Sequence, residues 1–144
     1  MRFISRVFII FLVFFSFSCG PITSESLLGP TSQCDSETTA MILIQDGFLQ
    51  NVCGCEEGEV AFSSSEILTC TVSASTTVIF NYSNSQLSHQ VISSGTPNFV
   101  SSPIHDPYLQ SNNNLTYAVT LSETGTYQFF DAFNETLTGQ IIVE

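Results

Sequence analysis

The sequence ends in Gly125-Thr-Tyr-Gln-Phe-Phe-Asp-Ala-Phe-Asn-Glu-Thr-Leu-Thr-Gly-Gln-Ile-Ile-Val-Glu144, and this stretch decides the fold. Two parts of it, residues 126–130 and 139–143, are short and rich in β-branched and aromatic side chains, a composition typical of β-strands. Between them lie Asp131, Asn134 and Leu137. The stretch therefore predicts two strands joined by a connection that carries polar side chains.

The chain from residue 59 onward repeats this strand pattern, and no helical period of comparable length competes with it. Short strands at such spacing are typical of an antiparallel β-sandwich, here an all-β domain of about seven to eight strands. The longest gap, residues 94–114, reads as a surface loop. Before the sandwich, residues 39–58 predict one strand, a turn at Asp46-Gly47 and an irregular return. The other predicted strands are residues 60–62, 67–72, 76–82, 89–93 and 116–121.

The first residues have the features of an export signal. Residues 1–18 combine two arginines with an apolar run that is too short for a membrane span. Cys19 follows small residues, as in a bacterial lipobox, so we expect a lipoprotein acylated at Cys19 in the cell envelope, periplasmic or surface-exposed. Ordinary secretion is the alternative. Residues 19–38 are rich in Ser, Thr, Pro and Gly and predict a flexible tether.

The charge of the chain is strongly one-sided. The sequence has 13 acidic residues against two arginines, Arg2 and Arg6, and a formal net charge of −11. Both arginines lie in the predicted leader, so the mature chain would carry no Lys or Arg. An acidic surface repels phosphate backbones, which argues against nucleic-acid binding.

Four cysteines follow Cys19, namely Cys34, Cys53, Cys55 and Cys70. An even number in an exported chain predicts two disulfides. A bridge between Cys53 and Cys55 would close a strained ring, so we expect these two to pair separately with Cys34 and Cys70, in an order that the sequence leaves open. A Cys-x-Cys metal or redox site is the alternative reading.

Three blocks within residues 59–144 resemble the cupredoxins, the plastocyanin and amicyanin type of copper domain. They are Phe62-Ser-Ser-Ser-Glu-Ile67 with Thr76-Thr-Val-Ile-Phe80, then Asn81 to Val91 with its histidine, then the C-terminal stretch. The resemblance implies a cupredoxin-like Greek-key β-sandwich over residues 59–144.

The same resemblance identifies the copper-ligand positions. His89 matches the first histidine ligand, Asp131 stands at the cysteine, Asn134 at the second histidine and Leu137 at the axial methionine. A blue copper centre requires a thiolate and two imidazoles. The domain is therefore expected to be degenerate at these positions and to have no type 1 copper and no electron-carrier function.

His89 could still act in one of two ways. With Asp131 and His105 it could form a mixed nitrogen and oxygen site for Cu or Zn, which would make the chain a metal-binding envelope protein. Alternatively, His89 and Asp131 hydrogen-bond to each other across the former pocket, and His105 is an exposed loop residue.

No Ser, His and acid arrangement rises above chance in the sequence, so we expect no enzyme and no catalytic residues. In cupredoxins the end of the domain near this loop docks partners, which implies a protein-partner surface formed by Phe133, Leu137 and the loop at residues 94–114. The sequence thus predicts an exported, copper-free binding or structural module.

Overall fold

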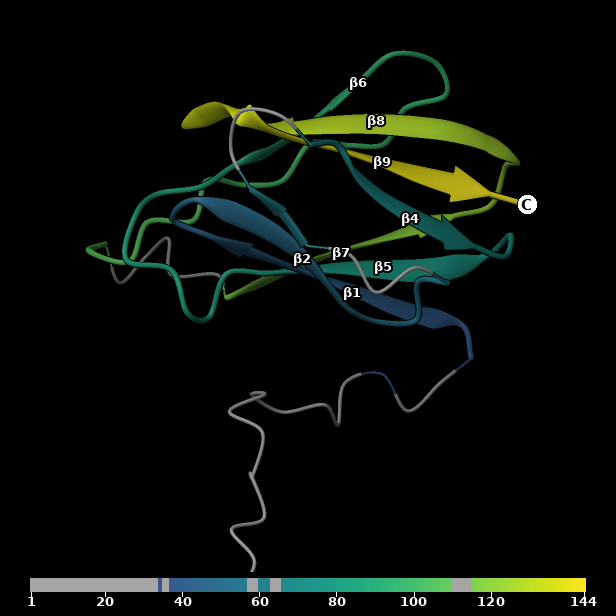
Figure 1. The fold of residues 1–144 in the computed structure, drawn as a ribbon, viewed down its shortest axis with the longest axis horizontal. Helices are drawn as coiled ribbons and strands as arrows, with labels where there is room; N and C mark the ends of the chain where they lie inside the picture. The colour runs from purple at the N-terminus through teal and green to yellow at the C-terminus, as the bar shows by residue number, and fades with distance from the viewer. Residues whose placement is uncertain (1–33, 35–36, 57–59, 63–65, 110–114) are drawn as a thin grey trace, which may run out of the picture.

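The computed structural model describes residues 34, 37–56, 60–62, 66–109 and 115–144, and these form β-strands and connecting loops without an α-helix (Figure 1). β-Branched and aromatic residues dominate the strands, as expected for half-buried pleated segments. The strands are β1 (Thr39–Gln45), β2 (Phe48–Cys53), β3 (Val60–Phe62), β4 (Leu68–Val72), β5 (Thr76–Asn81), β6 (Val91–Ser94), β7 (Thr116–Leu121), β8 (Gly125–Asp131) and β9 (Asn134–Val143).

The strands form two sheets that pack face to face. One sheet has the order β3-β2-β1-β5-β7, and the other has the order β4-β9-β8-β6. The pairs β1/β5 and β4/β9 are parallel, whereas the remaining pairs are antiparallel. After β3 the chain crosses between the sheets at every connection until β8. The predicted all-β, cupredoxin-like sandwich is confirmed, with nine strands in the described part of the chain.

The strand that exceeds the predicted number comes from residues 39–58. The predicted turn at Asp46-Gly47 is present, but β1 and β2 form a regular hairpin in which Gln45 pairs with Phe48, so the irregular return was wrong. β1 also pairs with β5 in the middle of its sheet. The sandwich therefore begins at Thr39, and a domain boundary at residue 59 does not hold.

The C-terminal hairpin is tighter than the sequence suggested. β9 begins at Asn134 instead of residue 139, so only Ala132 and Phe133 separate it from β8. Asp131 is paired with Asn134, after a register shift between Phe130 and Asp131. The stretch that would form a ligand loop in a cupredoxin is thus mostly paired strand.

The core lies between the sheets and takes alternate residues of each strand. In β8 these are Tyr127 and Phe129, and the Phe129 ring meets Phe80 of the opposite sheet edge-on at 5.1 Å between centroids. Burying one large apolar side chain contributes about 1.5–3 kcal/mol, so this layer is the main source of stability in a chain with few ion pairs.

Both disulfides form as expected, with Cys53 and Cys55 in separate bridges. Cys34 pairs with Cys53, and Cys55 pairs with Cys70. The second bridge connects the segment after β2 in one sheet to β4 in the other. Gly54, between the two half-cystines, has φ +75° and lies so close to Thr39 that an added Cβ would be 2.1 Å from its carbonyl oxygen. Only glycine fits this position.

The predicted leader at residues 1–18, the acylation site Cys19 and residues 20–33 of the tether lie outside the described residues. Within the described ranges, the structure contains no helix with the length and apolar character needed to cross a bilayer.

Candidate functional site

Three connections meet at one end of the sandwich (Figure 1), and four polar side chains from them are linked by hydrogen bonds there. Asp46 comes from the β1–β2 turn, Ser85 and His89 from the segment between β5 and β6, and Asp131 from the end of β8. We call these four residues the polar cluster. Its members are joined in one continuous series of hydrogen bonds.

The innermost contact joins His89 to Asp131. The Nδ1 of His89 lies 2.6 Å from Oδ2 of Asp131, and the two side chains are only 2% and 1% exposed. The other carboxylate oxygen of Asp131 accepts hydrogen bonds from the backbone N–H groups of Gln90 and Phe133. Asp131 therefore holds the imidazole and the tight β8–β9 turn at once, and both its oxygens are in use.

The other ring nitrogen of His89 points to Ser85. Its Nε2 lies 2.6 Å from the Ser85 hydroxyl, which in turn donates to Oδ1 of Asp46 at 2.5 Å. Asp46 also accepts from the backbone N–H groups of Gln86 and Leu87. With both nitrogens protonated, His89 donates to Asp131 and to Ser85, and the Ser85 proton goes to Asp46. Every hydrogen in this arrangement has an acceptor.

The surroundings favour a charged imidazole. Burial, the largest single influence, opposes charge on His89. The hydrogen bond and negative charge of Asp131, followed by those of Asp46, outweigh it and raise the pKa of His89 above 6.5. Burial likewise acts to raise the pKa of Asp46, but its hydrogen bonds from Ser85, Gln86 and Leu87 lower it below 3.8 overall.

His105 lies beside the cluster instead of on an exposed loop. It forms an isolated antiparallel bridge with His89 through two backbone hydrogen bonds of 3.0 and 2.8 Å, and its side chain is 1% exposed. The Tyr82 ring stacks against both imidazoles, with centroids 6.3 Å from His89 and 5.1 Å from His105. The expectation of an exposed His105 was wrong because this bridge pulls the loop onto the sandwich.

The remaining predicted positions do not join the cluster. The side chain of Asn134 accepts a hydrogen bond from the Thr136 hydroxyl on the surface. Leu137 is 1% exposed and packs in the core, so it cannot contribute to a partner surface as expected. Phe133 is 55% exposed and remains available at this end.

These residues do not fit a blue copper centre. All four cysteines from Cys34 onward are in disulfides, so no thiolate is present among them. Both ring nitrogens of His89 are already in hydrogen bonds. Across the described ranges, no three or more His, Cys, Asp or Glu side chains are grouped so as to hold a metal ion. The expected hydrogen bond between His89 and Asp131 is present.

The sequence reasoning missed Ser85 and Asp46. Ser85, His89 and Asp131 do form a Ser, His and acid series, contrary to expectation. The available signals were weak: a Ser four residues before the His, and the Asp of a turn-forming Asp-Gly pair. What the sequence could not supply was that the β1–β2 turn lies against the segment before β6.

Comparison with known proteins gives structural likeness alone. No family model and no curated protein matches the chain. Among solved structures, a purple cupredoxin from Nitrosopumilus maritimus is 19% identical with a TM-score of 0.48, over 73% of this chain and 99% of that one. A reduced amicyanin with a Trp-to-Tyr substitution is 15% identical with a TM-score of 0.49, over 78% and 89%.

These likenesses concern the path of the chain only. The fold assignment rests on the strand order and pairing of this chain: two facing sheets, each with one parallel pair, and repeated crossings between them. The domain is a cupredoxin-like β-sandwich in which a buried network of hydrogen bonds lies at the end where the resemblance places copper.

Proposed function

We propose that this chain is an exported, lipid-anchored cell-envelope protein whose sandwich serves as a binding or structural module and not as an electron carrier. One observation supports the part of the proposal that concerns electron transfer. The histidine that matches a copper ligand is buried between Asp131 and Ser85, with both ring nitrogens in hydrogen bonds of 2.6 Å. A metal would have to replace one of these bonds and compete with a proton that the acidic partners stabilise.

Copper titration tests the absence of electron-carrier chemistry. Addition of Cu(II) to the purified protein should give no intense visible band of the kind that a Cu–thiolate bond produces. The matched control is the same titration with the disulfides reduced, which shows whether a thiolate could supply the band. A stoichiometric band from the disulfide-intact protein would refute the proposal.

The anchor is tested separately. Acylation at Cys19, after removal of residues 1–18, would fix the chain to a membrane, and residues 20–38 would hold the sandwich away from it. Mass spectrometry of the mature N terminus should detect an acylated Cys19, and a Cys19→Ala variant should move to the soluble fraction. An unmodified N terminus at another residue would show ordinary secretion instead.

Apolar side chains around the polar cluster supply the proposed contact surface for a protein partner. Leu87, Ile104 and Phe133 are each within two residues of a residue of the cluster or its bridge partner His105, and each is more than two-fifths exposed. Such side chains at one end suit a partner contact. A photo-crosslinker at Phe133 should capture a defined partner in cells, whereas one at the exposed Glu123 should not.

We assign the Ser85, His89 and Asp131 series a structural and not a catalytic role. Ser85 is 5% exposed, and its proton is already directed to Asp46. A serine nucleophile must reach its substrate and give its proton to the histidine. A fluorophosphonate probe should leave Ser85 unlabelled in the intact protein; labelling that disappears in Ser85→Ala would establish an active serine.

A further inference from the structure

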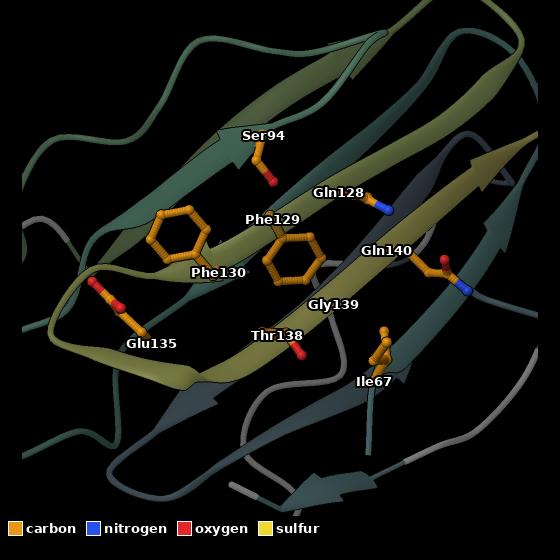
Figure 2. A pocket seen from close by; sticks show the side chains of 9 residues that line it. All are labelled: Ile67, Ser94, Gln128, Phe129, Phe130, Glu135, Thr138, Gly139 and Gln140. Atoms are coloured by element: carbon orange, nitrogen blue, oxygen red, sulfur yellow. The ribbon is translucent and has the colours of Figure 1, made fainter. Parts of the chain in front are cut away.

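A groove lies on the outer face of the four-stranded sheet, and its lining includes no residue of the polar cluster (Figure 2). Its volume is about 420 Å³, within the range of small-ligand sites. Side chains from β6, β8 and β9 line it, and Ile67, just before β4, closes one side. Gly139 and Phe129 also belong to its lining, but the Phe129 ring itself packs in the core between the sheets.

Polar side chains cross this groove in a row set by the strand register. Ser94 of β6 is opposite Gln128 of β8, and Gln128 is opposite Gln140 of β9. Gln140 donates a hydrogen bond from Nε2 to the Thr69 hydroxyl at 3.0 Å. Its amide oxygen takes no part in this bond. The exposed Gln128 amide makes no hydrogen bond to any described residue. The row thus offers amide donors and acceptors to a ligand.

An aromatic surface lies next to this row. Phe130 is half-buried in β8, pairs with Thr138 and shares the groove with it. A ring in this position presents an apolar surface beside hydrogen-bonding groups. The aliphatic C–H groups of a polar ligand can pack against such a ring while the hydroxyl groups of the same ligand reach the amides.

The electrostatics limit the kind of ligand. Among the described residues that line the groove, none is Lys, Arg or His, and Glu135 is the one charged residue. An anionic ligand would meet no cation there and would approach an acidic protein. A purely apolar ligand would cover two glutamine amides without giving them partners, which is costly.

We infer that this groove binds a neutral, hydroxyl-rich ligand, namely a segment of an uncharged saccharide. Sugar hydroxyls both donate and accept, as Gln128, Gln140, Ser94 and Thr138 do, and the C–H face of a sugar ring suits Phe130. The inference rests on the proposed binding role and gives it a ligand class, at a groove whose lining does not include Phe133.

The test is a titration of the ¹⁵N-labelled protein, followed by two-dimensional NMR, with four neutral oligosaccharides: cellotetraose, chitotetraose, maltotetraose and mannotetraose. At least one should shift the backbone signals of Phe130, Gln128 and Gln140 at concentrations up to about 10 mM. Phe130→Ala and Gln128→Ala should each weaken this binding by about tenfold, and Phe133→Ala should leave it unchanged. An oligogalacturonate of equal length should not bind.

Three results would overturn the inference: no shift with any neutral oligosaccharide, shifts confined to the Phe133 end, or binding of the acidic oligosaccharide alone. Retained dispersion in the NMR spectra of the variants excludes loss of folding as the cause of weaker binding. None of these results bears on copper or on the anchor, so failure here is distinguishable from failure of the proposed function.

Discussion

The polar cluster and the groove use similar side chains in opposite ways. In the cluster, His89, Asp131 and Ser85 are buried and direct their hydrogen bonds to one another and to the backbone. In the groove, Gln128 lies on a sheet face and offers its amide outward. Buried polar groups stabilise a fold only when they are satisfied internally, whereas exposed groups remain available for ligands. The polar cluster, at the end that resembles a copper site, is therefore a structural network, and the plain sheet face is the candidate for binding a small ligand.

Removal of Asp131 should break the cluster most severely. Asp131→Ala leaves a buried imidazole without its acidic partner, and we expect the free energy of unfolding to fall by about 3–5 kcal/mol. Gln128→Ala in the groove should change it by less than about 0.5 kcal/mol. Urea unfolding of both variants measures the difference. Equal effects at the two positions would contradict the distinction between the regions.

The Cys55–Cys70 bridge should have the next largest effect, because it links the sheet that carries the groove to the strands that carry Asp46. Its closed loop spans 15 residues, and replacing both cysteines by Ser should lower the free energy of unfolding by about 2–4 kcal/mol. Thermal and urea unfolding of the double variant check this. A double variant as stable as the native protein would show that the sheets do not need the bridge.

The pH dependence of stability should come from the cluster and not from the groove. The pKa of His89 is raised above 6.5, so its contribution is fully present below about pH 6.5 and is lost as the pH rises through the folded pKa. The pKa of Asp46 is lowered below 3.8, so its contribution is lost as the pH falls through that lower value.

Urea unfolding between about pH 5 and pH 9 tests the contribution of His89 to stability. Stability should decline toward the alkaline side, and a His89→Gln variant should lose that decline, while Gln140→Ala should keep it. If the His89→Gln variant declined as steeply as the native protein, the cause would lie outside the cluster.

Asp46→Asn should have the smallest effect of the changes in the cluster. The Asp46 side chain is 37% exposed, so water can replace part of its hydrogen bonding with Ser85, Gln86 and Leu87. We expect a loss of about 1 kcal/mol in the free energy of unfolding. A loss as large as that of Asp131→Ala would mean that the outer acid, and not the inner one, holds His89.

The strands were predictable from the sequence because their patterns are local. The alternation in β5, β7 and β8 and the Asp-Gly turn follow from neighbouring residues alone. The division of Cys53 and Cys55 between two partners followed from ring strain. By contrast, the regular pairing of β2 and the full length of β9 depend on their partner strands. The residue patterns of these two segments do not by themselves indicate regular strands of that length.

The site was predictable only in part. The resemblance placed His89 and Asp131 opposite each other, and they do meet. Ser85 and Asp46 join them because separate turns pack together, and His105 is buried because its backbone bridges to that of His89. Leu137 was misplaced because the tight turn at Ala132 and Phe133 puts it on an inward-facing strand position. These are long-range contacts that no local pattern records.

The most direct test of the account is ¹⁵N NMR of the His89 side chain near pH 6, with and without one equivalent of Zn(II). We expect that Nδ1 and Nε2 both carry protons, in hydrogen bonds to Asp131 and Ser85, and that neither signal moves when zinc is added. A His89 ring with one unprotonated nitrogen that shifts on stoichiometric zinc would contradict the claim that this end of the sandwich is a closed structural network.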